Sequence, residues 1–278
     1  MNKIIDCHTH LQTKELIDEY FEKRKGYAIS IKALDSLIGN GDDFYKATKD
    51  YKNIFICECI DALEDINPQL KQIKENLKKY RIVGIKIYLG YQPIFADDEK
   101  LFPVYDFAKK YGLSVLFHCG VGAQELESYS EENSSSSIPV GKIAKLYPTV
   151  NFIASHFDSP NLQDCAKVVM ENENVFTDIS GEYENLNNLS YKELMNIYFD
   201  HMIPIIKLYG KNNLAKKVMF GTDYFGKGSG FDAIEEYIET IKILFGKENI
   251  EDCLYNNCLK AYPKIKDYIN ENYENQTL

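Results

Sequence analysis

Short runs of apolar, β-branched residues alternate with segments of helix length along the whole chain. Between the runs, segments such as Ile66–Tyr80 and Lys100–Tyr111 repeat apolar residues with the 3.6-residue period of an amphipathic helix. The candidate strands are Ile4–Cys7, Tyr27–Ile31, Ile54–Ile60, Val83–Leu89, Ser114–His118, Asn151–His156, Val175–Ser180 and Val218–Asp223. Eight strands that alternate with helices predict an α/β fold, a (β/α)8 TIM barrel, in one domain over residues 1–278.

Other classes of protein do not fit this sequence. No G-x-G-x-x-G follows the first apolar run, which argues against a dinucleotide-binding sheet. The formal net charge of -10 leaves no basic surplus to neutralise phosphates, so neither nucleic acid nor an anionic membrane is an expected partner. No apolar run approaches the ~18 residues of a membrane span. We expect a small molecule as the partner, and a homodimer is a compatible assembly.

The start of the chain and its cysteines bear on location. The first candidate strand begins at Ile4, which leaves no room for the ~7 apolar residues that a signal peptide needs. The seven cysteines include no C-x-x-C pair. Cys57 and Cys59 lie one residue apart and are candidate metal ligands, but buried thiols in a reducing cytosol are the favoured interpretation. We therefore expect a cytoplasmic globular protein.

Four of the five histidines end candidate strands, and the fifth lies in a helical segment with no expected role. His8 and His10 follow the first run as H-x-H, and alternate residues of a strand point to the same face. His118 and His156 end the fifth and sixth runs, in VLFHCG and FIASHFD, and Asp223 ends the eighth, in VMFGTDYF. The carboxyl ends of barrel strands meet at one rim, where such barrels keep their catalytic groups. Since imidazole and carboxylate bind divalent metals, the sequence predicts a metal site at this rim.

This order of histidines and aspartate along the strands resembles the amidohydrolase superfamily. The segment GIKIYLGYQPIFADDEKLFPVYDFAKKYGLSVLFHCG is similar to the superfamily's second large branch, which includes the aminocarboxymuconate-semialdehyde decarboxylase type. A later segment, LYNNCLKAYPKI, is similar to the closing helix of the family, so the resemblance spans nearly the whole chain. It implies a distorted TIM barrel with a divalent metal, usually zinc, in its mouth.

The resemblance also implies roles for single residues. The metal ligands would be His8, His10, His118 and Asp223. His156 would be an acid/base group beside one metal, or a ligand of a second metal as in binuclear relatives. One Zn²⁺ is the expected cofactor, with Mn²⁺ or a second metal as alternatives, and zinc lowers the pKa of a bound water from about 15.7 to about 7. Asp223 can then act as general base, and His156 can polarise the substrate carbonyl or protonate the oxyanion.

Lys86 is a charged residue inside the apolar fourth run, between Ile85 and Ile87, and must therefore face something other than apolar core. If it faces the barrel mouth, Tyr88 shares its face. Three interpretations are open: a carboxylated bridge between two metals, a cation that grips a substrate carboxylate or carbonyl, or a partner of Glu58 on the third strand. We favour substrate contact by Lys86 and Tyr88, because the surrounding motif resembles the mononuclear branch.

Further residues carry weaker expectations. Asp6 is expected on the same inward face as the first histidine, where it would orient a ligand or bond to backbone. Asp178 would orient the sixth-strand histidine in the same way. The segment Gly122–Ile138 is expected to be a long polar loop at the catalytic rim. Phe225–Gly230 lies where barrels often bind phosphate, although a flexible turn is the favoured interpretation.

The chain contains only two arginines, Arg24 and Arg81, and both precede strands, which places them at the bottom of the barrel. A decarboxylase that acts on a dicarboxylate usually grips it with a guanidinium. The sequence therefore favours a hydrolase that activates a zinc-bound water to cleave an amide, ester or lactone, while Lys86, Lys142 and Lys227 leave an acidic substrate open. The alternative is a metal-dependent non-oxidative decarboxylase or lyase. A binding barrel without turnover is disfavoured by the intact ligand set.

Overall fold

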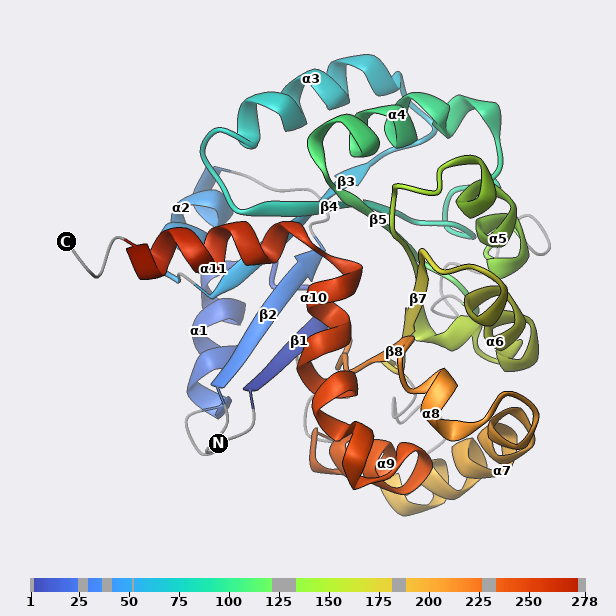
Figure 1. Cartoon of the computed structure of the whole chain (residues 1–278). Coiled ribbons are helices and arrows are strands. Elements are labelled where there is room, and N and C mark those ends of the chain that lie inside the picture. Colours follow the sequence, from blue (N-terminus) through green and yellow to red (C-terminus); the bar gives the residue numbers. More distant parts are fainter. Residues whose placement is uncertain are drawn as a thin grey trace.

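Eight parallel strands form one sheet, in which each strand pairs with its neighbours in chain order. The computed structural model describes residues 3–24, 30–36, 42–51, 53–121, 134–181, 189–226 and 234–274. The strands are β1 (Lys3–Thr9), β2 (Ser30–Ser36), β3 (Ile54–Ile60), β4 (Ile82–Ile87), β5 (Ser114–Phe117), β6 (Phe152–Ala154), β7 (Val175–Asp178) and β8 (Val218–Met219). The architecture confirms the predicted TIM barrel (Figure 1).

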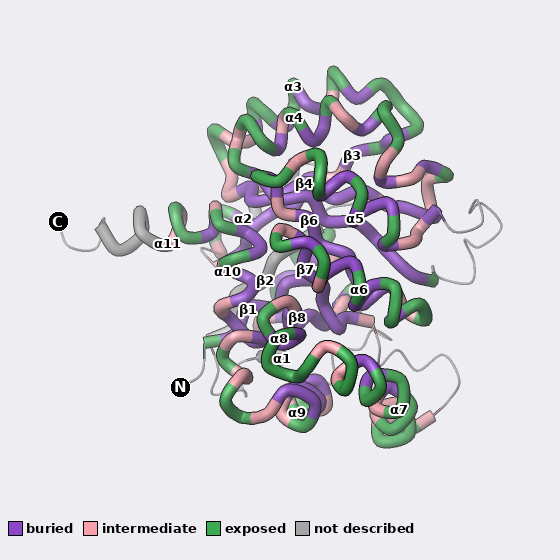
Figure 2. The backbone as a smooth tube through the Cα atoms, turned by 45° about the vertical axis from the view of Figure 1, so that its right-hand side comes forward, coloured by how far each residue is buried: buried purple, intermediate pink, exposed green. Residues whose placement is uncertain are grey.

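Helices connect the strands and cover the outside of the barrel (Figure 1). They are α1 (Lys14–Arg24), α2 (Asp42–Asp50), α3 (Ile66–Asn76), α4 (Phe102–Tyr111), α5 (Ser137–Leu146), α6 (Leu162–Glu171), α7 (Tyr191–Tyr209), α8 (Lys211–Leu214), α9 (Ile234–Phe245), α10 (Asn257–Ala261) and α11 (Lys264–Glu274). Among these described helices, none has the length and apolar character needed to cross a bilayer. Figure 2 shows strands that are buried almost throughout, while the helices expose their outer faces.

Two apolar clusters hold the barrel together. The larger cluster packs the outer face of the strands against the helices and includes Ile85 and Tyr105. The smaller cluster fills the barrel interior, where Cys7 packs with residues of the C-terminal helices such as Cys258 and Ile265. Figure 1 shows α10 and α11 across one end of the barrel, and the hydroxyl of Ser114, the first residue of β5, donates to a carbonyl there. These helices thus cover the amino ends of the strands and leave the site to the carboxyl ends.

The barrel closes between β1 and the segment that follows β8. The backbone N–H of Cys7 donates to the carbonyl of Phe220 (3.0 Å), and that of His10 donates to the carbonyl of Tyr224 (2.7 Å). Closure therefore runs through the H-x-H segment itself. The seam places the residues after β8 directly beside the two histidines of β1.

Several predicted boundaries differ from the observed ones. The second strand lies further along the chain than the predicted Tyr27–Ile31, whose residues 27–29 lie outside the described residues. The sixth and eighth strands end before His156 and Asp223, because both residues adopt positive φ values (56° and 55°) that are incompatible with an extended strand. The predicted loop Gly122–Ile138 also ends too late, since α5 begins at Ser137; its residues 122–133 lie outside the described part of the chain.

Candidate metal centre

The two histidines of β1 meet the carboxylate of Asp223. Asp223 Oδ1 lies 3.0 Å from Nε2 of His10 and 3.5 Å from Nε2 of His8. The backbone N–H of Asp223 donates to the carbonyl of His8 (2.9 Å), so the barrel seam fixes the turn that carries this side chain. Its left-handed backbone is one that aspartate tolerates better than most residues. The predicted convergence of H-x-H with the aspartate after the eighth strand is present in the structure.

A tight turn after β6 positions His156. The three residues His156–Asp158 all have positive φ, between 51° and 56°, a backbone that costs free energy in residues other than glycine. The buried carboxylate of Asp158 holds the turn, because its Oδ2 accepts bonds from the N–H (2.8 Å) and hydroxyl (2.6 Å) of Ser137. The turn stacks the imidazole of His156 on that of His8, with ring centroids 4.8 Å apart.

The end of β7 contacts both stacked imidazoles through Asp178 and Ser180. The Ser180 hydroxyl lies 3.1 Å from Nδ1 of His8 and 2.9 Å from Nδ1 of His156, and it donates its own proton to Oδ1 of Asp178. Asp178 Oδ2 lies 3.4 Å from Nδ1 of His8. Asp178 also accepts a bond from the backbone N–H of His156, so its carboxylate contacts the ring of His8 and only the backbone of His156. The prediction that Asp178 orients the ring of His156 by direct contact is wrong, because the Ser180 hydroxyl lies between this carboxylate and the ring.

These hydrogen bonds assign the tautomers of the two imidazoles. Nδ1 of His156 lies 2.9 Å from the carbonyl oxygen of Ser180, and since a carbonyl only accepts, Nδ1 carries the proton. The Ser180 hydroxyl proton is committed to Asp178, so the hydroxyl accepts from Nδ1 of His8 as well. In its neutral form each ring therefore presents a lone pair on Nε2.

The residues at this rim fit a divalent metal ion. Ligand atoms of His8, His156 and Asp223 all lie within 4.8 Å of one another. Nε2 of His8 and the carboxylate oxygen of Asp223 lie 3.5 Å apart. Both are acceptors, so a cation or a proton donor that binds to both would stabilise this arrangement. His118, whose ring centroid is 5.0 Å from that of His156, has a buried Nε2 without a hydrogen-bond partner among the described residues. Such an orphaned nitrogen is costly unless something binds it.

The predicted ligands occupy two neighbouring places. In the first place, Nε2 of His8 and Nε2 of His10 both lie near Oδ1 of Asp223. In the second place, the ring of His118 lies beside the ring of His156. His156 lies inside the group of close ligand atoms, so its position suits either of its predicted roles, acid/base group or ligand. Imidazole nitrogens and a carboxylate oxygen are donors that suit Zn²⁺.

The protonation states at the rim also favour metal binding. Burial, followed by the charge of Lys86, lowers the pKa of His8 to about 4. Burial lowers the pKa of His118 well below its usual value, with the charge of His156 as the next cause. Burial opposes ionisation of Asp223, but the nearby His156 and His8 outweigh it and hold the pKa of this carboxyl well below its ordinary range. At neutral pH the site therefore offers the neutral imidazoles of His8 and His118 and the ionised carboxylate of Asp223, the forms that bind metals.

Lys86 points into the barrel mouth. Its side chain is fully buried, and its Nζ lies 3.3 Å from Nε2 of His8 and 3.5 Å from the hydroxyl of Ser155. The same Nζ lies 5.0 Å from the ring centre of Tyr88, whose hydroxyl is 3.5 Å from Nδ1 of His10. Burial lowers the pKa of Lys86, while the carboxylate of Asp223 partly offsets this effect.

The alternative pairing of Lys86 with Glu58 is wrong. Glu58 accepts hydrogen bonds from the side-chain amide of Asn76 (2.9 Å) and the hydroxyl of Tyr45 (2.9 Å), which belong to α3 and α2. Its neighbour Ile56 packs in the outer cluster, which places Glu58 on the outer face of β3. Lys86 and Glu58 thus lie on opposite faces of the barrel wall.

Asp6 does not share the inward face of His8, contrary to the prediction. Its carboxylate accepts bonds from the hydroxyl of Tyr20 (2.8 Å) on α1 and from the N–H (3.0 Å) and hydroxyl (2.7 Å) of Thr222. The pairing register of β1 shifts between Asp6 and Thr9, and this irregularity breaks the alternation of faces. Asp6 instead ties α1 to the residue before Asp223, and the bonds that it accepts from the backbone N–H groups of His8 and Thr222 confirm the alternative prediction that it bonds to backbone.

The remaining predicted residues lie away from the described rim or outside the described residues. Arg81 donates to the backbone carbonyls of Ile54, Thr48 and Tyr51, as its place before β4 predicts. Lys142 pairs with Asp97 (3.0 Å) on the surface. Most of Phe225–Gly230, with Lys227, and the side chain of Arg24 lie outside the described part of the chain.

Three residues of the site are not among those predicted from the sequence. Ser180 had a usable signal, since it alternates with Asp178 at the end of an apolar strand. The ring of Tyr91, 4.8 Å from that of His118, had none. Gly221 had none either: a Cβ at this position would lie 3.0 Å from Cβ of Ser180 and 3.1 Å from that of His8. The absence of a side chain at Gly221 lets His8 and Ser180 approach closely enough for the hydrogen bond between Nδ1 of His8 and the Ser180 hydroxyl.

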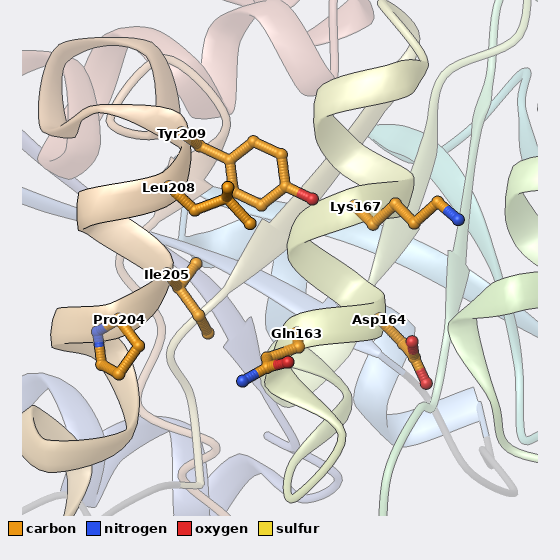
Figure 3. Close-up of a pocket in the computed structure, with 7 residues that line it drawn as sticks. All are labelled: Gln163, Asp164, Lys167, Pro204, Ile205, Leu208 and Tyr209. Atoms are coloured by element: carbon orange, nitrogen blue, oxygen red, sulfur yellow. The ribbon is translucent and has the colours of Figure 1, made fainter.

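A groove of about 310 Å³ lies elsewhere, between α6 and α7 in the outer ring (Figure 3). It is lined by Gln163, Asp164, Lys167, Pro204, Ile205, Leu208 and Tyr209. Figure 3 shows one carboxylate and one ammonium, both from α6, opposite a mainly apolar face of α7. The residues that line this groove include no histidine. The cluster of histidines and aspartate described above lies apart from it, at the carboxyl ends of the strands.

Solved structures share this fold. An uncharacterized TIM-barrel protein from Bordetella bronchiseptica is 18% identical, with a TM-score of 0.66, and the match covers 94% of this chain and 99% of that one. A probable 2-pyrone-4,6-dicarboxylic acid hydrolase from Acinetobacter baumannii, with citric acid bound, is 14% identical (TM-score 0.63; 95% and 100% covered). The 5-carboxyvanillate decarboxylase of Sphingomonas paucimobilis is 10% identical (TM-score 0.61; 95% and 99% covered).

The sequence itself matches one family model. No curated protein sequence matches the chain. The model of the Amidohydro_2 family, described as amidohydrolase, matches residues 5–264, from the first strand to the start of α11. This match confirms the resemblance drawn from the order of histidines and aspartate along the strands. The chain therefore belongs to the amidohydrolase family of enzymes.

Proposed function

We propose that this protein is a metal-dependent hydrolase that cleaves an amide, ester or lactone of a small molecule. The observation that carries the proposal is the convergence of His8, His156 and Asp223, with His10 in contact with the same carboxylate. This arrangement combines metal-binding groups with two groups that can move a proton at one point.

One Zn²⁺ is the proposed cofactor, held by His8, His10, His118 and Asp223. When bound, it would lower the pKa of a water molecule and polarise the substrate carbonyl.

The proposed location is the cytoplasm. The seven cysteines are free thiols, and six of them are buried, which supports this location because disulfides are rare there.

The residues of the chain divide the proton transfers between them. Asp223 accepts the proton of the attacking water, as the water oxygen bonds to the carbonyl carbon, and returns it to the leaving nitrogen or oxygen as that bond breaks. His156 presents a lone pair on Nε2 when neutral, so it donates to the developing oxyanion only as an imidazolium, with its Nδ1–H held by Ser180. Lys86 and Tyr88 are the proposed substrate contacts.

The proposed reaction class rests on where the cations of the chain lie. Arg81 binds backbone carbonyls below the barrel, and Lys86 is a buried cation beside the proposed metal site. Among the side chains that the structure describes, no guanidinium lies at the rim to grip a carboxylate, so we favour hydrolysis of a neutral carbonyl over loss of carbon dioxide. The names of the structural neighbours, one hydrolase of a pyrone dicarboxylate and one decarboxylase, keep the decarboxylase as the alternative.

A substrate panel tests this choice. We expect the zinc-loaded protein to turn over lactones, esters or amides faster than it releases carbon dioxide from aromatic or unsaturated carboxylic acids. Acid release and bicarbonate release are followed side by side on the same preparation. Dominant decarboxylation, abolished by Lys86→Ala, would contradict the hydrolase assignment and make Lys86 the residue that grips the carboxylate.

A further inference from the structure

The ammonium of Lys86 and a metal ion need the same lone pair. Nδ1 of His8 carries its proton toward Ser180 and Asp178, which leaves a single lone pair on Nε2. Lys86 Nζ lies 3.3 Å from this nitrogen, at hydrogen-bonding distance. An imidazole nitrogen with one lone pair accepts one hydrogen bond or binds one metal, and cannot do both.

Lys86 also lacks the usual partner of a buried ammonium. Among the residues that the structure describes, no carboxylate oxygen lies within 4.0 Å of its Nζ, and its polar contacts there are Nε2 of His8 and the Ser155 hydroxyl. That hydroxyl is 3.5 Å away, and its own proton goes to the carbonyl of Phe117. Nε2 of His8 is therefore a better acceptor for the Lys86 ammonium than the Ser155 hydroxyl, and the negative charge of Asp223 lies nearby.

We propose that Lys86 competes with the metal ion for His8. The N–H of Lys86 that points at Nε2 of His8 takes the lone pair that a metal would need, and it places positive charge near Asp223. Metal binding must displace this N–H, and the freed ammonium, 5.0 Å from the ring centre of Tyr88, becomes available to a substrate oxygen. The inference rests on the metal site of the proposed function, but not on the reaction that the site performs.

The test compares the affinity of metal-free protein for Zn²⁺ in wild type and in the Lys86→Met variant, by calorimetry or competition with a chromophoric chelator. Methionine keeps an unbranched side chain and removes the donor, so the barrel is expected to fold, which circular dichroism checks. Loss of a hydrogen bond from a charged donor predicts a Kd at least about tenfold lower in Lys86→Met. Lys142→Met, the same change at a surface lysine that pairs with Asp97, is the matched control and should leave the Kd unchanged.

A structure of the wild-type protein with Zn²⁺ separates displacement from a general effect of charge. We expect Lys86 Nζ beyond hydrogen-bonding distance of Nε2 of His8 once the metal is bound, while a retained contact would overturn the inference. Equal or weaker Zn²⁺ binding by Lys86→Met would also overturn it, and an intact mass raised by one carbon dioxide would then identify Lys86 as a carboxylated ligand. If neither the wild type nor Lys86→Met binds Zn²⁺, the metal site of the proposed function is contradicted as well. If both bind Zn²⁺ with the same Kd, only the competition by Lys86 is contradicted, and the metal site stands.

Discussion

The substitution Asp223→Asn is expected to lower kcat by about 100- to 10,000-fold on any lactone, ester or amide that the wild-type protein hydrolyses. An asparagine amide cannot accept the proton of the attacking water, although it has nearly the shape of aspartate. The carboxylate also contacts His8 and His10, so weaker metal binding is expected in the same variant. Steady-state kinetics must therefore be measured at saturating Zn²⁺, with the metal content determined on the same sample.

Asp97→Asn is the matched control for this substitution, because Asp97 forms a surface ion pair with Lys142 away from the strand ends. Its kcat should equal that of the wild type. A kcat for metal-loaded Asp223→Asn within a few fold of the wild-type value would show that another group takes the proton. His156, with its lone pair facing the site, would then be the base.

The substitution His8→Ala is expected to abolish both metal binding and turnover. Nε2 of this imidazole lies next to Asp223, and Nδ1 is held by Ser180, so the ring links the proposed metal site to β7. His156→Ala should instead retain the metal and lose most turnover, since its proposed role is to stabilise the oxyanion. Elemental analysis and kinetics on both variants make the comparison.

His201→Ala, at an exposed position on α7, is the control for these two variants and should retain metal and activity. Loss of metal from His156→Ala would assign this residue as a ligand rather than an acid/base group. Metal retained in full by His8→Ala would contradict the site assignment itself.

The barrel could be predicted from the sequence because its signal is periodic and local. Apolar runs and helix-length segments alternate regularly, and a tight strand end such as VLFHCG is visible without any contact information. The barrel rim then followed from topology, since the carboxyl ends of parallel strands meet. His8 and Asp223 meet in the structure as this topology predicts, although their positions differ by 215 along the chain.

What failed was the assignment of faces and strand ends. Barrel strands are buried on both faces, so alternation alone does not say which face is the interior. The alternative that paired Lys86 with Glu58 requires an inward Glu58, but this residue faces α2 and α3. At Asp6 a register shift broke the alternation itself. At His156 and Asp223 the chain leaves the strand through positive φ angles, which no local pattern of apolar residues announces. Such irregular backbone tends to cluster at functional sites.

The metal content of the purified wild-type protein tests the central claim most directly. After dialysis against Zn²⁺ and removal of free metal, elemental analysis should find one tightly bound ion per chain, and anomalous diffraction should place it between His8, His10, His118 and Asp223. Two ions about 3.5–4 Å apart, bridged through a modified Lys86, would contradict the mononuclear site. A protein that hydrolyses its substrate at full rate with no metal bound would contradict the account as a whole.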